Sequence, residues 1–294
     1  EVPSIPEAES APDVSTPEGA LEYINATTQD LDAVDPQVRS QQLDEMFSNT
    51  WRSPLDTNRE HNELGPAADE WTSERAALHE AMWDDLVTKV QIANVPKNRD
   101  ALVLGGLPGA GKSSALKPGQ AASKFGIVSW DPSEGDPPAG TTHVSVNPDS
   151  IKEMLIDAGA LPSGINDGLK PLEQVTFIHE ESSFLSKLFL KRLSDEGYNV
   201  VLDNTMETPN GMLKRMGPLA GSGYNFRGIF VDIPVDESKL SARRRYVSSF
   251  DTPRGGRYVP TAVQADRTSS RGRKSANRDA FDVGYLLLDR IGLG

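Results

Sequence analysis

The chain has 294 residues, a net charge of −13 and no cysteine. This length can bury one large core or two modest ones. Without cysteine there are no disulfides and no thiolate metal sites, which fits a reducing compartment. No stretch approaches the roughly 20 apolar residues of a membrane span, and the first residues lack the basic start and apolar run of a signal peptide. We therefore expect a cytoplasmic protein without a membrane partner.

The acidic residues are concentrated in the first third of the chain. Residues 1–100 contain 21 acidic and 7 basic side chains, whereas residues 101–294 contain 22 and 23. An acidic leader joined to a balanced body indicates two parts with different roles. The acid either keeps a helical segment soluble or allows that segment to pack near a basic site of the body, and the sequence leaves both interpretations open.

The leader is predicted to be a tail followed by helices. Residues 1–17 are rich in Pro, Glu and Ser and have little to bury, so we expect a flexible tail. Thr16 and Pro17 are typical of a helix start, because Thr caps the first amides and Pro suits the first helical position. An acidic helical segment is expected over residues 18–94, with further helices at 36–47 and 66–93. Apolar side chains at three- to four-residue spacing mark one face of the last helix: Trp71, Leu78, Met82, Leu86 and Val90.

From residue 100 onward, short aliphatic runs alternate with helical segments. Strands are expected at 101–104, 143–146, 199–203, 225–233 and 285–288, and helices after Gly111, at 148–156, at 171–194 and from Asp236. Because parallel strands need crossover connections, this alternation predicts an α/β fold with a mostly parallel sheet flanked by helices. Residues 131–140, dense in Pro, Gly and acidic side chains, are expected to form a loop insertion.

A glycine-rich loop, Gly106-Leu-Pro-Gly-Ala-Gly-Lys-Ser113, follows the first of these strands and precedes a helix. Glycine lets the backbone wrap closely around phosphates, so that N–H groups and the helix N-terminus face the negative charge. Lys112 then reaches the β- and γ-phosphates, and the Ser113 hydroxyl ligates Mg²⁺. No guanine-reading Asn-Lys-x-Asp element occurs, which favours ATP over GTP. The predicted ATP site, in a P-loop kinase-type domain over residues 95–294, comprises Gly106, Gly109, Ala110, Gly111, Lys112, Ser113 and Ser114.

Two polar segments follow later strands, at the edge of the sheet where the P-loop is expected. Asp149, in Asn147-Pro-Asp-Ser-Ile-Lys152, can accept the proton of an attacking hydroxyl or join the magnesium shell, or it can cap the next helix. Asp203 can orient a magnesium-bound water or the substrate, and Thr205 can bind a substrate hydroxyl or phosphate. Ordinary strand exits also prefer such residues, so this position alone does not assign the role.

A third segment is rich in arginine, with Arg243, Arg244 and Arg245 followed by Arg254 and Arg257. Phosphoryl transfer spreads negative charge over the transferring oxygens, and arginine supplies planar, permanently charged donors for it. Neighbours on a helix point about 100° apart, so at most one or two of the three adjacent arginines are expected in a site. The alternative is a solvated basic helix face or a nucleic-acid patch.

Together these segments resemble the zeta toxin family of P-loop kinases, which is related in fold to chloramphenicol phosphotransferase. The resemblance covers roughly residues 95–260 and rests on the order of the elements at 106–114, 147–152, 179–183, 190–199, 200–205, 245–246 and 257–260. Zeta toxins phosphorylate the 3′-hydroxyl of the sugar in UDP-N-acetylglucosamine and are held inactive by an antitoxin. The resemblance implies that Lys112 and Ser113 handle ATP and Mg²⁺, that Asp149 is the general base, that Arg245 and Arg257 clamp the phosphates, and that Asp203 and Thr205 hold the acceptor.

The chain departs from the family pattern at one position. A substrate-binding glutamate of the family falls on Lys187 here. Glu181, or its neighbour Glu180, lies two turns earlier and is the expected substitute. The departure concerns the acceptor rather than the chemistry, so UDP-N-acetylglucosamine is a first candidate within a family of diverse substrates.

The leading hypothesis is an ATP-dependent kinase that phosphorylates a hydroxyl of a small metabolite, a nucleotide sugar first. One alternative is a polynucleotide 5′-kinase, although the nearly neutral body and the few aromatics disfavour nucleic acid. Another is a nucleotide-dependent binding module without turnover. For the acidic segment 18–94 we consider an intramolecular mask of the nucleotide site, an adaptor, or a stabilising helical layer. An antitoxin is the expected external partner.

Overall fold

The computed structural model describes residues 12–29, 31, 35–50, 53–61, 70–205, 208–259 and 276–290. Its centre is a five-stranded sheet in the order β2-β3-β4-β1-β5, in which every neighbouring pair is parallel. The strands are β1 (Asp100–Gly106), β2 (Ser129–Trp130), β3 (His143–Ser145), β4 (Val200–Asn204) and β5 (Asn225–Val231). The predicted α/β fold with a mostly parallel sheet is confirmed.

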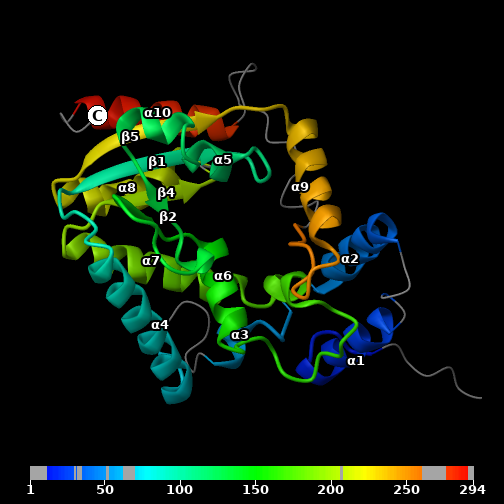
Figure 1. Ribbon diagram of the computed structural model, residues 1–294. Coiled ribbons are helices and arrows are strands. Elements are labelled where there is room, and N and C mark those ends of the chain that lie inside the picture. The colour runs from blue at the N-terminus through cyan, green and yellow to red at the C-terminus, as the bar shows by residue number, and fades with distance from the viewer. Residues whose placement is uncertain are drawn as a thin grey trace, which may run out of the picture.

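Helices pack on both faces of this sheet (Figure 1). The helices of the body are α5 (Lys112–Leu116), α6 (Pro148–Asp157), α7 (His179–Asp195), α8 (Pro209–Gly221), α9 (Val235–Ser249) and α10 (Ala276–Arg290), with 3-10 helices η2 (Ala121–Phe125), η3 (Pro132–Glu134) and η4 (Pro171–Thr176). Of these, α9 lies away from the sheet and packs on the N-terminal helices instead (Figure 1). Alternate residues of a strand face opposite sides. Val103 of β1 therefore packs in the main core with α7, whereas Leu104 packs with Ala122 of η2. Burial on both faces explains why β1 is a continuous aliphatic run.

Several elements of the body differ from the prediction, and one of them is α8, for which no helix was expected. Residues 285–288 belong to α10, so the predicted last strand is wrong: Phe281 and Tyr285 lie four residues apart, and their ring centroids are 4.8 Å apart on one helical face. The helix expected over 171–194 is divided into η4 and α7. Just before the loop at 131–140, β2 forms an edge strand that was not predicted, because two residues carry no periodic signal.

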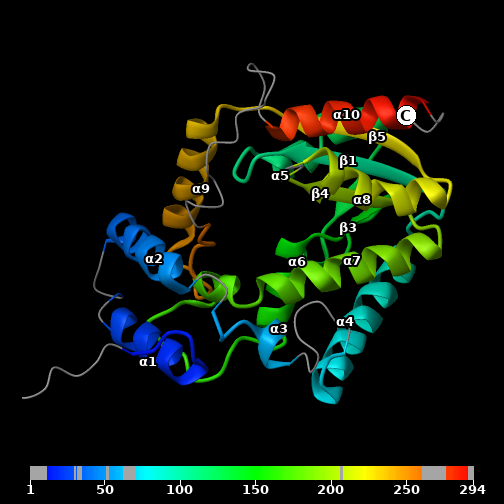
Figure 2. The same ribbon diagram turned by 180° about the vertical axis from the view of Figure 1, so that it is seen from behind.

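The leader contains α1 (Pro17–Thr28), α2 (Pro36–Thr50), α3 (Thr57–Glu60) and α4 (Ser73–Ile92). The predicted start of α1 is confirmed, because the Gly19 amide donates to the Thr16 hydroxyl at 3.1 Å. Residues 1–11 of the predicted tail and residues 66–69 of the predicted third helix lie outside the described residues. Figures 1 and 2 show α2 beside α9, and α4 alongside α7. Within the described ranges no helix is long and apolar enough to cross a membrane.

Two buried ion pairs fasten the leader to the body. Arg39 of α2 donates from Nε to Glu173 Oε1 at 2.7 Å, and neither side chain is exposed. Arg75 of α4 donates from Nε and Nη2 to the two oxygens of Glu181, at 2.7 Å in each case. Removing one partner of a buried pair leaves the other charge unpaired and typically costs about 3–5 kcal/mol. The leader is therefore joined to the body by buried ion pairs and not only by surface contacts.

Candidate active site

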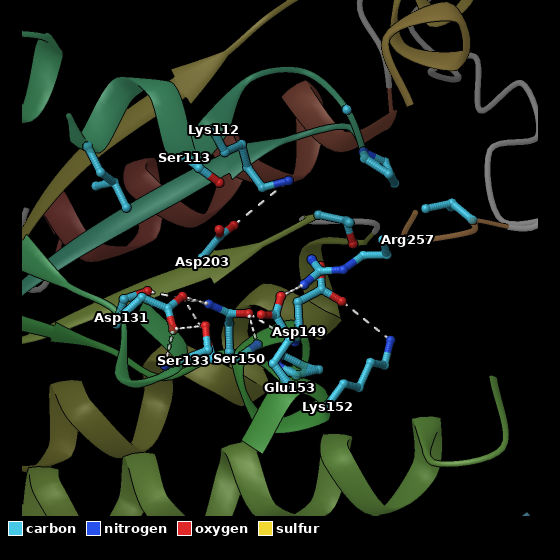
Figure 3. Close-up of a pocket in the computed structure, with 18 of the residues that line it drawn as sticks. Lys112, Ser113, Asp131, Ser133, Asp149, Ser150, Lys152, Glu153, Asp203 and Arg257 are labelled. Carbon is cyan, nitrogen blue, oxygen red and sulfur yellow. Dashed lines mark hydrogen bonds and ion pairs between the residues drawn. The ribbon is translucent and has the colours of Figure 1, made fainter. Parts of the chain in front are cut away.

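The P-loop joins the end of β1 to the start of α5 (Figure 3). Gly109 has a φ of +81°, and a Cβ added to it would lie only 2.7 Å from the Ser238 carbonyl oxygen of α9. Glycine is thus required where α9 presses on the loop. Lys112 donates from Nζ to the carbonyl oxygens of Gly106 and Leu107, at 3.1 and 3.3 Å. Through these contacts the loop backbone surrounds the Lys112 ammonium.

The loop opens onto a cleft of about 2470 Å³. A single small-molecule ligand needs roughly 300–1,000 Å³, so the cleft has room for a donor and an acceptor together. Of the predicted nucleotide-binding residues, those that line it are Gly109, Gly111, Lys112, Ser113 and Ser114. Gly106 and Ala110 are buried beside this lining.

Asp203 and Thr205 lie at the end of β4 and line the same cleft. Asp203 Oδ1 is 3.8 Å from Lys112 Nζ. Burial, together with the negative charges of Asp149 and Asp131, raises the pKa of Asp203 to about 6, although Lys112 opposes the shift. The carboxylate is thus a stronger base than an ordinary aspartate and remains mostly ionised at pH 7.

Asp149 lies in the first turn of α6, with its side chain about half exposed at 49%. The helix is capped by Asn147, whose Oδ1 accepts from the Asp149 and Ser150 amides at 2.9 and 3.0 Å. The N-cap of α6 is therefore Asn147, and Asp149 does not cap this helix. Desolvation by the walls of the cleft would by itself raise the pKa of Asp149, but Lys152, Arg257 and Arg245 outweigh it and hold that pKa well below its usual range. The carboxylate is ionised at neutral pH.

Among the five arginines, only two line the cleft, Arg245 and Arg257. Arg257 Nη1 lies 2.9 Å from Asp149 Oδ2, and Arg257 also pairs with Glu153. Arg254 instead pairs with Asp157 at the far end of α6. The expectation that the adjacent arginines cannot all face one site holds, because Arg245 alone of the three lines the cleft.

Glu181, predicted to bind substrate, is fully buried and does not line the cleft. Both of its oxygens are occupied by Arg75, its Oε2 accepts from the Thr57 hydroxyl at 2.5 Å, and its Oε1 is 2.8 Å from His79 Nε2. That assignment is corrected, because a carboxylate so fully bonded has no oxygen left for a substrate. Its neighbour Glu180 does line the cleft, whereas Lys187 does not.

Asp131 was not among the predicted site residues, yet it lines the cleft at the end of β2. Its Oδ2 accepts from Ser150 Oγ at 2.6 Å, and its Oδ1 accepts from Ser133 Oγ at 2.7 Å. Figure 3 shows this cluster next to Asp149. The only signal in the sequence is an Asp directly after a two-residue strand, too short a pattern to separate from the loop that follows.

The leader also contributes to the cleft, as in the interpretation that its acidic segment packs near the basic site, but none of its residues was predicted to do so. The lining includes Asp44 and Phe47 of α2, and Asp56, Asn58 and Arg59 of α3 and its cap. None of them belongs to a recognisable motif, and they precede the P-loop by many residues. Only the folding of α2 and α3 onto the body brings them to the site.

The residues at the P-loop fit a magnesium ion. Mg²⁺ prefers oxygen ligands and is usually held by one or two protein groups together with substrate phosphates. The exposed Ser113 hydroxyl and the Asp203 carboxylate supply such groups at the cleft. In the described part of the chain no three His, Cys, Asp or Glu side chains gather into a cage of their own.

A parallel sheet that carries a P-loop after one strand, with a carboxylate and two arginines on the same cleft, defines a protein of the P-loop phosphotransferase type. The protein-family model for Zeta toxin matches residues 84–281. The chain therefore belongs to the zeta toxin family, whose members are kinases.

Two curated relatives carry the name of this family, and a solved structure shares the fold. The chain is similar to Toxin zeta of Enterococcus hirae, with 23% identity over 63% of this chain and 58% of the relative. It is also similar to Toxin zeta of Streptococcus pyogenes, with 23% identity over 60% of this chain and 55% of the relative. The crystal structure of AvrRxo1-ORF1:AvrRxo1-ORF2 with sulphate ions shares the fold, with a TM-score of 0.50, 18% identity, and coverage of 77% of this chain and 63% of that one. The chain thus spans less than two thirds of each of these relatives.

Proposed function

We propose that this protein is a kinase that transfers the γ-phosphoryl group of ATP to a hydroxyl of a small metabolite. A nucleotide sugar such as UDP-N-acetylglucosamine is the first candidate acceptor. The observation that carries the proposal is the placement of an ionised Asp149, paired with Arg257, on the same cleft as Lys112 and Ser113.

In the donor half, Lys112 and the P-loop amides bind the β- and γ-phosphates. Ser113 and Asp203 would hold Mg²⁺, and the bound ion would supply positive charge that neutralises the phosphates. The Lys112 ammonium, now 3.8 Å from Asp203, is within reach of both the loop and the carboxylate. Before ATP binds, the Lys112 ammonium is held by the loop carbonyl oxygens and lies near the Asp203 carboxylate.

In the acceptor half, Asp149 accepts the proton of the attacking hydroxyl, an effect typically worth about 10²–10⁴-fold in rate. Arg245 and Arg257 stabilise the charge that develops on the transferring oxygens, worth about 10³–10⁵-fold for arginines in this role. Phosphate oxygens compete with Asp149 for Arg257, so donor binding loosens the ion pair and makes Asp149 a better base. Thr205 and Glu180, both on the cleft, are placed to hold the acceptor.

A regulatory partner is part of the proposal. Members of this family work with antitoxins, and the solved relative is itself a complex of two chains. We propose that a separate protein closes the cleft of this chain. A co-expressed neighbouring-gene product that lowers ATP binding in proportion to its occupancy supports this, and one that binds without any effect on ATP contradicts it.

The proposed function is tested by acceptor-dependent ADP release. Purified protein is incubated with ATP, Mg²⁺ and a panel of nucleotide sugars, and products are followed by a mass increase of one phosphoryl group. We expect ADP release that depends on one class of acceptor. ATP binding without transfer to any sugar, nucleoside or polynucleotide 5′-hydroxyl would instead indicate a binding module without turnover.

A further inference from the structure

One wall of the cleft is made by the leader. Asp56 and Arg59, with Asp44 and Phe47, line the cleft that the P-loop also lines. Figures 1 and 2 show α3 across the molecule from α5, which follows the P-loop, and α2 at the side next to α9. The leader therefore contributes at the end of the cleft that a donor bound to the P-loop leaves open.

This wall is held in place by buried bonds to the body. The Thr57 amide donates to the Phe177 carbonyl at 2.9 Å, and the Thr57 hydroxyl donates to Glu181 at 2.5 Å. Glu181 in turn holds Arg75 of α4. The short helix α3 is thus bonded to the start of α7, where Glu180 faces the cleft. A wall fixed in this way is a preformed surface, which is what a specific binding site requires.

The chemistry of the wall suits a molecule with both hydroxyl and anionic groups. Asp56 and Glu180 are carboxyl groups, which bond hydroxyls. Burial raises the pKa of Asp56 to about 7, with a further rise from the Glu180 charge, although the Asn58 amide and the Arg59 charge oppose the shift. Arg59 is exposed, and its guanidinium forms no hydrogen bond or ion pair with the described residues. An unpaired guanidinium at a cleft is a ready partner for a phosphate or carboxylate.

We propose that the leader forms the acceptor subsite, in which Asp56 binds a hydroxyl and Arg59 binds an anionic group of the acceptor. Both are specificity-determining residues for the phosphoryl transfer. The inference rests on the proposed kinase function. It also assigns the acidic leader a role in substrate binding, in place of a mask over the P-loop.

The test separates the acceptor from the donor. Steady-state kinetics are measured for Arg59→Gln, Asp56→Asn and the control Arg244→Gln, which removes the same charge from an exposed position of α9 outside the cleft lining. The acceptors are the uridine diphosphate sugars of the panel. Asp56→Asn keeps an oxygen that can accept from the Asn58 amide and so preserves the start of α3. We expect an acceptor KM about tenfold higher for Arg59→Gln, with the KM for ATP within about twofold of the wild type.

The outcomes are distinguishable. If the wild type turns over while Arg59→Gln and Asp56→Asn keep its acceptor KM, the subsite is wrong and the kinase assignment stands. An equal rise for Arg244→Gln shows a general charge effect and also overturns the subsite. Tighter ATP binding by Arg59→Gln makes the leader a mask of the donor site, which contradicts the inference. If the wild type phosphorylates no acceptor although it binds ATP, the proposed function fails and the subsite falls with it.

Discussion

Asp149 and Arg257 form an ion pair on the cleft, with 2.9 Å between Oδ2 and Nη1. The two residues come from segments more than a hundred positions apart, and the resemblance to zeta toxins had implied separate roles for them, base and phosphate clamp. Their pairing links the two roles. In the proposed mechanism, the cation that would stabilise the transferring phosphoryl group also keeps the pKa of Asp149 low, so donor binding and the strength of the proposed base would be coupled.

Replacement of Asp149 by asparagine should remove the proton acceptor and leave the donor site intact. We expect kcat to fall at least about 100-fold, in the lower part of the range for general bases. ATP affinity, measured by titration calorimetry, should stay within about threefold of the wild type. The negative charge of Asp149 does not attract phosphates, so its removal takes no favourable contact away from ATP. Full turnover by this variant would show that Asp149 is not the base.

Lys152→Gln should move the pH profile. Lys152 Nζ lies 3.3 Å from Asp149 Oδ1 and is one of the charges that keep the pKa of Asp149 low. Without it that pKa rises, and below its pKa the base is protonated and inactive. The acid limb of kcat/KM should therefore shift to higher pH. The control Lys191→Gln removes an exposed lysine that pairs with Asp195 on α7, and its acid limb should match that of the wild type.

Glu181→Gln should destabilise the fold by about 3–5 kcal/mol at pH 7, because it leaves Arg75 buried without its counter-charge. Burial would raise the pKa of Glu181, but bonds from His79 and Arg75 lower it from 4.5 to about 2. A depressed pKa gives stability that is present above about 4.5 and lost as pH falls toward 2. The difference in unfolding free energy between variant and wild type should thus shrink over that interval.

The matched control for this measurement is Glu180→Gln, the same substitution one residue away on the cleft. Chemical denaturation should show a change within about 0.5 kcal/mol for it, as for an ordinary surface position. Equal losses for the two variants would contradict the distinction between a buried structural carboxylate and a cleft residue.

Gly109→Ala should distort the P-loop, because the added Cβ would clash with α9 in addition to the unfavourable positive φ at this position. Its Cβ would lie 2.7 Å from the Ser238 carbonyl oxygen. Gly223→Ala is the control, because Gly223 has a similar φ of +76° and no heavy atom within 4 Å of an added Cβ. We expect at least about tenfold weaker ATP binding for Gly109→Ala, together with the strain of about 1–3 kcal/mol that a left-handed residue brings. Gly223→Ala should show the strain alone.

Local patterns predicted the elements that depend on few residues. The cap at Thr16, the strand before the P-loop and the loop itself follow from short-range rules, and the structure has them where they were expected. Predictions failed where a segment was too short to show a pattern, or where its apolar residues fitted both the helical and the strand period. The two residues of β2 are below the length at which alternation is visible, and the aliphatic run at 285–288 satisfies a strand and a helix equally well.

The candidate site divides in the same way. Lys112, Asp149, Asp203 and Arg257 could be selected from the sequence because each follows a recognisable element, and they do line one cleft. Glu181 and its neighbour Glu180 could not be separated, because helix geometry alone does not say which of two adjacent side chains turns inward. The packing of α4 on α7 decided it, by burying Glu181 against Arg75.

The sequence by itself determined the fold class, the nucleotide loop and the resemblance to a kinase family, because these are written in local spacing and in the chemistry of single residues. Only the tertiary structure decided the membership of the cleft. Whether Arg245 rather than Arg244 faces it, whether Asp131 belongs to it, and whether Asp56 and Arg59 of the leader reach it all depend on long-range packing. Such contacts join residues far apart in the chain, so no local pattern encodes them.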